Sequence, residues 1–179
     1  MAKAANAADV IRARRIALNT RQEYISLFFR VVVLALAAYV VFTQVFLVTQ
    51  NKGLGMFPAM KDGDLIIAYR LQQDYAKNDV VVYEMNGEQK VGRIIARETD
   101  VVTLDESGTL IVNGTPQTGE VLYPTYAKKG MEYPCRIESG KLFILGDYRT
   151  NTKDSRDYGT ISEHKVKGKI ITILRRRGL

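Results

Sequence analysis

The sequence of 179 residues contains one cysteine, one histidine and no tryptophan. A single cysteine, Cys135, excludes an internal disulfide, so the folded part must be stabilised by its core alone. We expect Cys135 to be a small buried apolar residue rather than a nucleophile. His164 has no histidine or cysteine partner at ligand spacing, so a zinc site is not predicted, and we expect neither a metal nor a cofactor.

Basic residues are concentrated at the start of the chain. Residues 1–30 contain six basic side chains and two acidic ones, in a chain whose formal net charge is +7. No basic stripe is interleaved with aromatic residues, which speaks against a nucleic-acid partner. A basic segment beside an apolar run is typical of the cytoplasmic side of a membrane protein.

One long apolar run, residues 31–49, contains no charged side chain. A helix of this length spans about 28 Å, close to the ~30 Å hydrocarbon core of a bilayer. A buried core helix would need helical partners, and a cleaved signal peptide usually has a shorter apolar run followed by a small-x-small motif. We therefore expect a basic cytoplasmic segment (1–30), one transmembrane helix (31–49) and an extracellular domain (50–179) at the cell membrane.

Short apolar runs separated by turn residues follow this span and predict β-strands. The runs are 65–69, 80–83, 90–96, 101–104, 109–112, 141–145 and 167–174. Asn86-Gly87 predicts a tight hairpin between the second and third runs. Residues 115–140 contain three prolines and are expected to form a long irregular excursion. The pattern predicts a mainly β, antiparallel domain on a single N-terminal transmembrane helix.

Three blocks in this domain have a distinctive composition and order. Residues 55–64 read GMFPAMKDGD, residues 92–100 read GRIIARETD, and residues 146–156 read GDYRTNTKDSR. Their order and spacing resemble the type I signal peptidase family, the S26-type Ser–Lys proteases that remove signal peptides from exported proteins. The resemblance covers the anchor and nearly all of residues 50–174, and it implies a signal-peptidase-like β fold.

The blocks depart from the family pattern at the two catalytic positions. The family's nucleophilic serine falls on Gly55 and its general-base lysine falls on Gly92, and glycine supplies neither group. The resemblance therefore implies a catalytically degenerate member, like the relatives known as assembly factors for sortase-built pili of Gram-positive-type bacteria. Lys90 is a candidate substitute base, because on a strand it shares the face of Gly92 about 7 Å away.

The resemblance also implies two sets of supporting site residues. Apolar residues expected to line a peptide-binding groove are Met56, Phe57, Pro58, Ile66, Ile94 and Ile95, although the isoleucines also fit a core position. Residues expected to give structural support are Asp64, Arg93, Asp147, Arg149, Thr152, Asp154, Ser155 and Arg156. Within this set, Asp154 and Arg156 are expected to form an ion pair behind the site, and Thr152 replaces a serine that hydrogen-bonds the catalytic lysine. The terminal Arg175-Arg176-Arg177 is expected to be a solvated end.

Three functions remain open at this point. The first is a membrane-anchored, catalytically inactive homologue that binds a signal-peptide-like or pilin polypeptide and assists sortase-dependent pilus assembly, with a sortase as a further partner. The second is an active type I signal peptidase with a displaced catalytic dyad. The third is a structural envelope protein without a peptide groove. The loss of both catalytic side chains favours the first.

Overall fold

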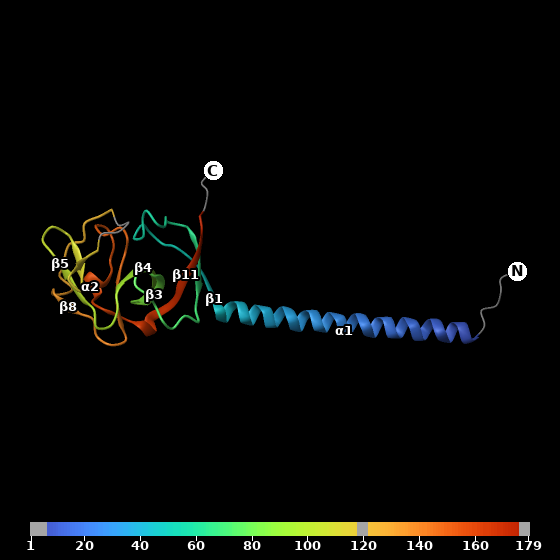
Figure 1. Cartoon of the computed structure of the whole chain (residues 1–179). Helices are drawn as coiled ribbons and strands as arrows, with labels where there is room; N and C mark the ends of the chain where they lie inside the picture. Colours follow the sequence, from blue (N-terminus) through green and yellow to red (C-terminus); the bar gives the residue numbers. More distant parts are fainter. Residues whose placement is uncertain (1–6, 118–121, 176–179) are drawn as a thin grey trace. The chain divides into compact units, whose positions relative to one another are not determined.

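The computed structural model describes residues 7–117 and 122–175, and the chain forms two compact units, Met1–Gln44 and Val45–Leu179 (Figure 1). The elements in chain order are α1 (Ala7–Val45), β1 (Phe46–Gln50), β2 (Leu65–Tyr69), β3 (Val80–Met85), β4 (Glu88–Ala96), β5 (Val101–Leu104), β6 (Leu110–Val112), β7 (Thr115–Pro116), β8 (Cys135–Arg136), β9 (Lys141–Leu145), α2 (Ser155–Tyr158), β10 (Ile161–Ser162), the 3₁₀-helix η1 (Glu163–Lys165) and β11 (Val166–Leu174).

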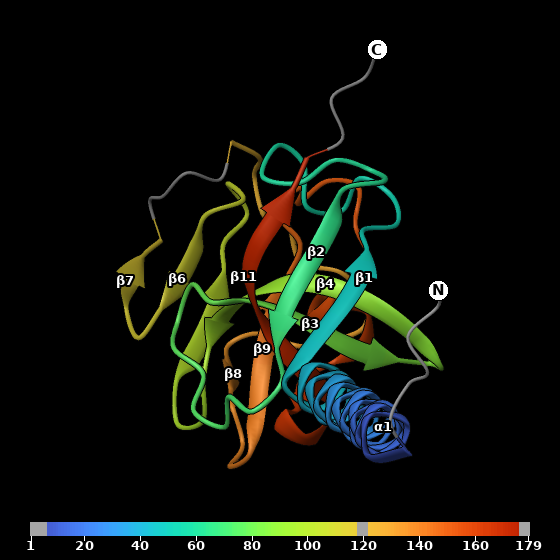
Figure 2. The same cartoon turned by 90° about the vertical axis from the view of Figure 1, so that its right-hand side faces the viewer.

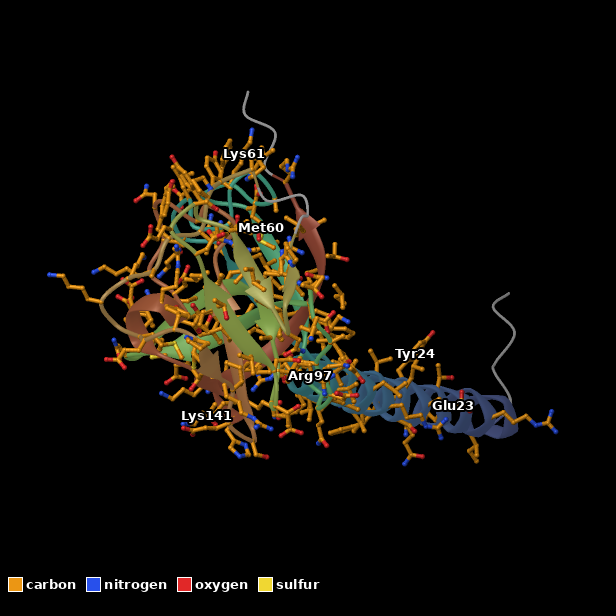
Figure 3. All side chains as sticks on the ribbon, turned by 60° about the vertical axis from the view of Figure 1, so that its left-hand side comes forward. Glu23, Tyr24, Met60, Lys61, Arg97 and Lys141 are labelled. Atoms are coloured by element: carbon orange, nitrogen blue, oxygen red, sulfur yellow. The ribbon has the colours of Figure 1, made fainter. Side chains whose placement is uncertain are left out.

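The first unit is the long helix α1. Its stretch Thr20–Val45 is the one helix in the described residues that is long and apolar enough to cross a membrane. Its large side chains are exposed, and Figure 3 shows Glu23 and Tyr24 projecting from the helix. Exposed apolar side chains over this length fit a membrane anchor.

The helix ends earlier than the apolar run does. Residues 46–49, which we expected in the membrane span, belong to β1 and pair with β2. The remaining fifteen helical residues from Val31 cover only about 22 Å. A crossing of ~30 Å therefore also needs the turn before Val31, which includes Arg30.

The second unit consists of two antiparallel sheets. The larger has the strand order β1-β2-β11-β3-β4-β9-β10, and the smaller has the order β7-β6-β5-β8. Figure 2 shows β1, β2 and β11 side by side. The predicted class, a mainly β antiparallel domain with one N-terminal apolar helix, is confirmed.

All seven predicted runs form strands, with ends that differ by at most two residues. The predicted hairpin is also present, since Asn86 and Gly87 have φ angles of 53° and 78° and join paired Met85 and Glu88. The strands that were not predicted are β1, β7, β8 and β10. All except β1 are only two residues long, and β1 continues an apolar run that also suits a helix.

The core of the β domain contains three clusters of buried side chains. One cluster joins Met56 and Met60 to the buried side chains of β2 and β3, which fastens the first sequence block to the larger sheet. In Figure 3, Met60 lies within the domain and the next residue, Lys61, points outward. Cys135 packs against a second cluster but is only half-buried, so the expectation of a buried cysteine was wrong. Burial raises the pKa of its thiol, which keeps it protonated.

Candidate functional site

The loop of residues 51–64 positions Gly55. Buried Asn51 spans this loop, and its Nδ2 donates to two main-chain carbonyls at 2.9 and 3.2 Å. The main-chain N–H of Asn51 donates to the carbonyl of Asp64 at 2.8 Å. The carboxylate of Asp64 in turn accepts from a main-chain N–H within the loop at 2.9 Å. With Met56 fully buried, the loop is held at both ends and at its middle.

Gly55 lines a cleft of about 690 Å³, which we call the Gly55 cleft. Its walls are residues 49–56, 82–83, 87–91 and 151–153. A Cβ added to Gly55 would lie 3.0 Å from Oγ1 and 3.6 Å from Cβ of Thr152, and no other residue beyond its chain neighbours lies within 4 Å. The nucleophile position is therefore at the surface of a cleft, with room for a small side chain.

Gly92 has different surroundings. A Cβ added there would lie 2.5 Å from Cγ2 of Ile144, 3.2 Å from the carbonyl oxygen of Leu145 and 3.2 Å from Cε1 of Tyr83. Ile144 and Tyr83 are fully buried, so neither side chain can move aside without disturbing the core. The neighbours of Gly92 thus fill the space in which the family's lysine side chain would begin.

Tyr83 does not replace the missing base. It lines the Gly55 cleft and lies beside the lysine position. Burial raises the pKa of Tyr83, and the negative charge of Asp154 raises it further. The phenol therefore stays protonated near neutral pH and cannot accept a proton from a nucleophile.

Lys90, the candidate substitute base, lines the Gly55 cleft and lies opposite Tyr83 in the β3–β4 ladder. Its Nζ lies 3.0 Å from Oε2 of Glu88, in an ion pair at the end of the hairpin. A general base must accept a hydrogen bond from the nucleophile, whereas this Nζ donates to a carboxylate. The structure thus places Lys90 in the cleft but in a contact that does not favour base chemistry.

The third sequence block forms a buried scaffold behind the cleft. Asp154 and Arg156 are each 1% exposed and share two hydrogen bonds, of 2.9 and 2.8 Å. Asp154 also caps α2 and accepts from the N–H of Gly146 at 3.3 Å. Ser155 Oγ accepts from the N–H of Ile144 at 2.9 Å. These bonds fix β9 and the turn after it.

Thr152 packs between two close backbone segments. A Cβ on Gly146 would lie 2.5 Å from the carbonyl oxygen of Gly55 and 2.6 Å from Oγ1 of Thr152. Lys128 donates to the carbonyl of Thr152 at 2.5 Å and pairs with Asp157 at 2.7 Å. The turn that faces Gly55 is therefore tied down from outside the cleft.

A second cleft, of about 850 Å³, lies on the other side of the first and third blocks. We call it the Arg149 cleft. In its wall, Arg93 forms a bidentate pair with Asp147, through hydrogen bonds of 2.9 and 2.7 Å. Arg149 is buried and donates to Oγ1 of Thr125 at 2.9 Å. Burial lowers the pKa of Arg149 to about 10, and the nearby Asp147 opposes this shift only in part.

The apolar residues expected in one groove are distributed over four places. Met56 lines the Gly55 cleft, whereas Pro58 and Ile95 line the Arg149 cleft. The ring of Phe57, in the first block, has its centre 6.2 Å from that of Tyr148, in the third block. Ile66 and Ile94 are fully buried in separate core clusters and line neither cleft, because their strand positions face inward. For these two, the alternative of a core position holds.

Sequence reasoning missed three residues that shape the site: Asn51, Tyr83 and Ile144. A two-residue hairpin at Asn86-Gly87 fixes the β3–β4 register, so the place of Tyr83 near Gly92 could have been found from sequence. The position of Ile144 depends on the β4–β9 pairing, which contains a register shift and has no local signal. Across the described ranges, no group of three or more His, Cys, Asp or Glu side chains is placed to hold a metal ion.

Comparisons with known proteins agree with the resemblance of the sequence blocks. The family profile described as signal peptidase, peptidase S26, matches residues 21–174. Signal peptidase IB of Staphylococcus aureus is 32% identical over 140 residues, which cover 66% of this chain and 72% of that protein. Signal peptidase I of Bacillus caldolyticus is 27% identical over 136 residues, covering 66% and 74%. A signal peptidase I structure from Enterococcus faecalis V583 aligns with a TM-score of 0.47 and 20% identity, over 56% of this chain and 98% of that one.

Proposed function

Because the chain belongs to the signal peptidase family, peptidase S26, we propose that it is a membrane-anchored, non-catalytic member that binds an extended polypeptide in the Gly55 cleft. The observation that carries this proposal is the filled space at Gly92, where an added Cβ would lie 2.5 Å from Ile144 Cγ2. The cleft thus has neither a nucleophile at residue 55 nor room for a lysine at residue 92. The cleft itself, of about 690 Å³, supports the binding part of the proposal.

Main-chain pairing gives such a site affinity without chemistry. β1 is the outer strand of the larger sheet, and the cleft wall continues from its end at Thr49 to Met56. An extended peptide gains hydrogen bonds from such an exposed backbone, and side-chain pockets add selectivity. The missing side chain at Gly55 lets the backbone of a peptide approach closely.

The partner and the topology are further parts of the proposal. By its resemblance to assembly factors, the bound polypeptide is a pilin or a signal-peptide-like segment, held near a sortase for pilus assembly. The basic start of α1 supports an orientation with the N-terminus in the cytoplasm and the β domain outside the cell membrane. These parts are supported by the sequence resemblance and by the charge distribution.

The alternative is an active signal peptidase with a displaced dyad. The observation in its favour is that Lys90 lines the same cleft as Gly55. Thr49 and Thr152 supply the aliphatic hydroxyl groups of that cleft. Against it, Lys90 is paired with Glu88, and Thr49 donates to the side chain of Gln89 at 3.1 Å.

A cleavage assay with the full-length protein in detergent and a fluorogenic signal-peptide substrate separates the two. The variants are Gly55→Ser with Gly92→Lys, and the same pair with Ile144→Ala, which removes the obstructing side chain. We expect no cleavage by the wild type or the double variant, and measurable cleavage by the triple variant. Wild-type cleavage that Lys90→Ala abolishes would instead establish the displaced dyad.

A binding assay tests the positive half of the proposal. We would titrate a fluorescein-labelled signal peptide and follow its anisotropy. Asn151→Trp fills the Gly55 cleft from its exposed wall, and Gln73→Trp places the same ring at an exposed position outside both clefts. We expect only Asn151→Trp to weaken binding. Absence of both cleavage and binding in the wild type would favour a structural protein without a groove.

A further inference from the structure

The Arg149 cleft shares no lining residue with the Gly55 cleft. It is lined by Pro58, Ala59, Asn78, Arg93, Ile95, Gly108, Thr109, Leu110, Gln117, Leu122, Tyr123, Pro124, Thr125, Asp147 and Arg149. One part of this lining is charged and the other is apolar. The cleft therefore combines charged groups that can bind an anion with apolar side chains that can pack against apolar groups of a ligand.

The charged part contains two guanidinium groups and one carboxylate. Both oxygens of Asp147 accept from Arg93, so that pair is internally satisfied. Arg149 forms no ion pair within the part of the chain that the structure describes. Its side chain donates from Nη1 to Thr125, and its buried Nε has no hydrogen-bond partner. One positive charge thus remains without a direct counter-charge.

An orphaned donor on a buried cation is costly unless a ligand satisfies it. Arg149 is only 3% exposed, and burying a guanidinium without an anionic partner is unfavourable. A carboxylate is the matching partner, because its two oxygens accept from the planar guanidinium in a bidentate arrangement. A monoanion would also balance the single excess charge of Arg93, Asp147 and Arg149 together.

The apolar part suits the carbon atoms next to such a carboxylate. Leu122 is 75% exposed, and the ring of Tyr123 lies 4.6 Å from that of Tyr148, which fixes its position. Ile95 and Leu110 form buried parts of the same wall. Apolar side chains beside one charged group are typical of a site that binds a carboxylate flanked by apolar groups of the same ligand.

We propose that the Arg149 cleft binds a carboxylate group of a polypeptide, with the neighbouring apolar side chains packed on Leu122 and Tyr123. The site goes beyond the proposed function, because it neither uses nor requires the Gly55 cleft. The carboxylate comes from an acidic side chain or from a C-terminus. The chemistry of recognition is the same for both, and the experiment distinguishes them.

The test uses the full chain in detergent and three acetylated, fluorescein-labelled hexapeptides rich in leucine and valine. One contains a central glutamate and an amidated C-terminus. The second contains glutamine there and is amidated, and the third contains glutamine and a free C-terminus. We expect either the glutamate peptide or the peptide with a free C-terminus to bind about tenfold more tightly than the amidated glutamine peptide. A hydrogen bond to a charged group contributes about this much to the affinity. The identity of that peptide gives the source of the carboxylate.

Matched variants assign the binding to this cleft. Leu122→Glu places a carboxylate at the rim of the cleft, and Leu71→Glu places one at an exposed leucine outside both clefts. We expect Leu122→Glu and Arg149→Met to weaken binding of the preferred carboxylate peptide about tenfold, with its affinity for Leu71→Glu unchanged. Equal affinity for all three peptides, or equal loss in Leu122→Glu and Leu71→Glu, would overturn the proposal. If Arg149→Met does not fold, the two leucine variants decide.

Discussion

The sequence blocks predict that Gly55 and Gly92 stand at the nucleophile and general-base positions of the family pattern. In the molecule the two glycines have different surroundings. An added Cβ at Gly55 meets one flexible hydroxyl at 3.0 Å and is otherwise in an open cleft. An added Cβ at Gly92 meets a buried isoleucine at 2.5 Å, with a tyrosine and a carbonyl close by. A side chain at the first position would point into a cleft, whereas a side chain at the second would meet the core. Restoring the two side chains therefore poses two different physical problems.

One structural element connects the two positions. Ile144, in β9, packs against Gly92, and Gly146, just after β9, approaches the carbonyl of Gly55. The buried pair of Asp154 and Arg156 holds this segment from behind, since Asp154 accepts from Gly146. Changes in this scaffold should affect both positions, and changes at either glycine should affect one.

The largest loss of stability is expected from Arg156→Met, which should disturb the surroundings of both Gly55 and Gly92. It leaves the 1%-exposed carboxylate of Asp154 without its partner, and such a change costs about 3–5 kcal/mol of unfolding free energy. Denaturant titration of the full-length protein measures the loss. The control Arg136→Met changes an exposed arginine in β8 and should stay near wild type. A loss under ~1 kcal/mol would contradict the scaffold role.

Gly92→Ala is the next largest, at about 1–3 kcal/mol, because one methyl group overpacks the core beside Ile144. Combining it with Ile144→Ala should be less costly than the sum of the two single changes, since the cavity left by the isoleucine accepts the new methyl. The double-mutant cycle by denaturant unfolding gives this coupling. Strict additivity would show that the two residues do not compete for space.

Gly55→Ser should change stability by no more than ~0.5 kcal/mol, as expected at a position with open space. The one close contact is Oγ1 of Thr152, and Thr152→Ala removes it. We therefore expect Gly55→Ser to cost no more in the Thr152→Ala background than in the wild-type background, measured by the same unfolding experiment. A loss as large as that of Gly92→Ala would remove the distinction between the two glycines.

The smallest expected effect on stability comes from Asp100, in the turn after β4, the strand that carries Gly92. Burial on its own raises the pKa of Asp100, but hydrogen bonds from Arg97 N–H, Lys77 and Asn113 outweigh it, and the net pKa is lowered. The unfolded chain thus binds more protons in acid, so this contribution is present above the ordinary pKa near 3.8 and is lost as pH falls below it. Asp100→Asn should flatten the fall of Tm in that window. An unchanged pH profile would contradict the assignment.

The strands and the turns of this fold follow closely from the sequence. Short apolar runs between turn residues located β2, β3, β4 and β9, and the pair Asn86-Gly87 fixed the hairpin, because these signals are local. β1 escaped prediction for a physical reason. Its apolar residues continue the run of the membrane helix, and composition alone cannot show where a helix gives way to a strand.

The site was predictable only where it depends on spacing. The motif order located Gly55, Gly92 and the third block, but it could not show that Ile144 fills the lysine position. That contact depends on long-range pairing of β4 with β9 across a register shift. By contrast, the pair of Glu88 and Lys90 could have been predicted, because residues two apart on a strand lie on the same face.

The packing around Gly92 also determines the order in which substitutions could introduce a lysine there. A lysine introduced at residue 92 alone meets the core before it gains any chemistry, so selection for cleavage has no first step to favour. A smaller side chain at residue 144 must come earlier, and it costs stability while residue 92 is still glycine. A stepwise path to a lysine at residue 92 therefore passes through a less stable intermediate. The order of the two substitutions is set by the packing of one buried isoleucine.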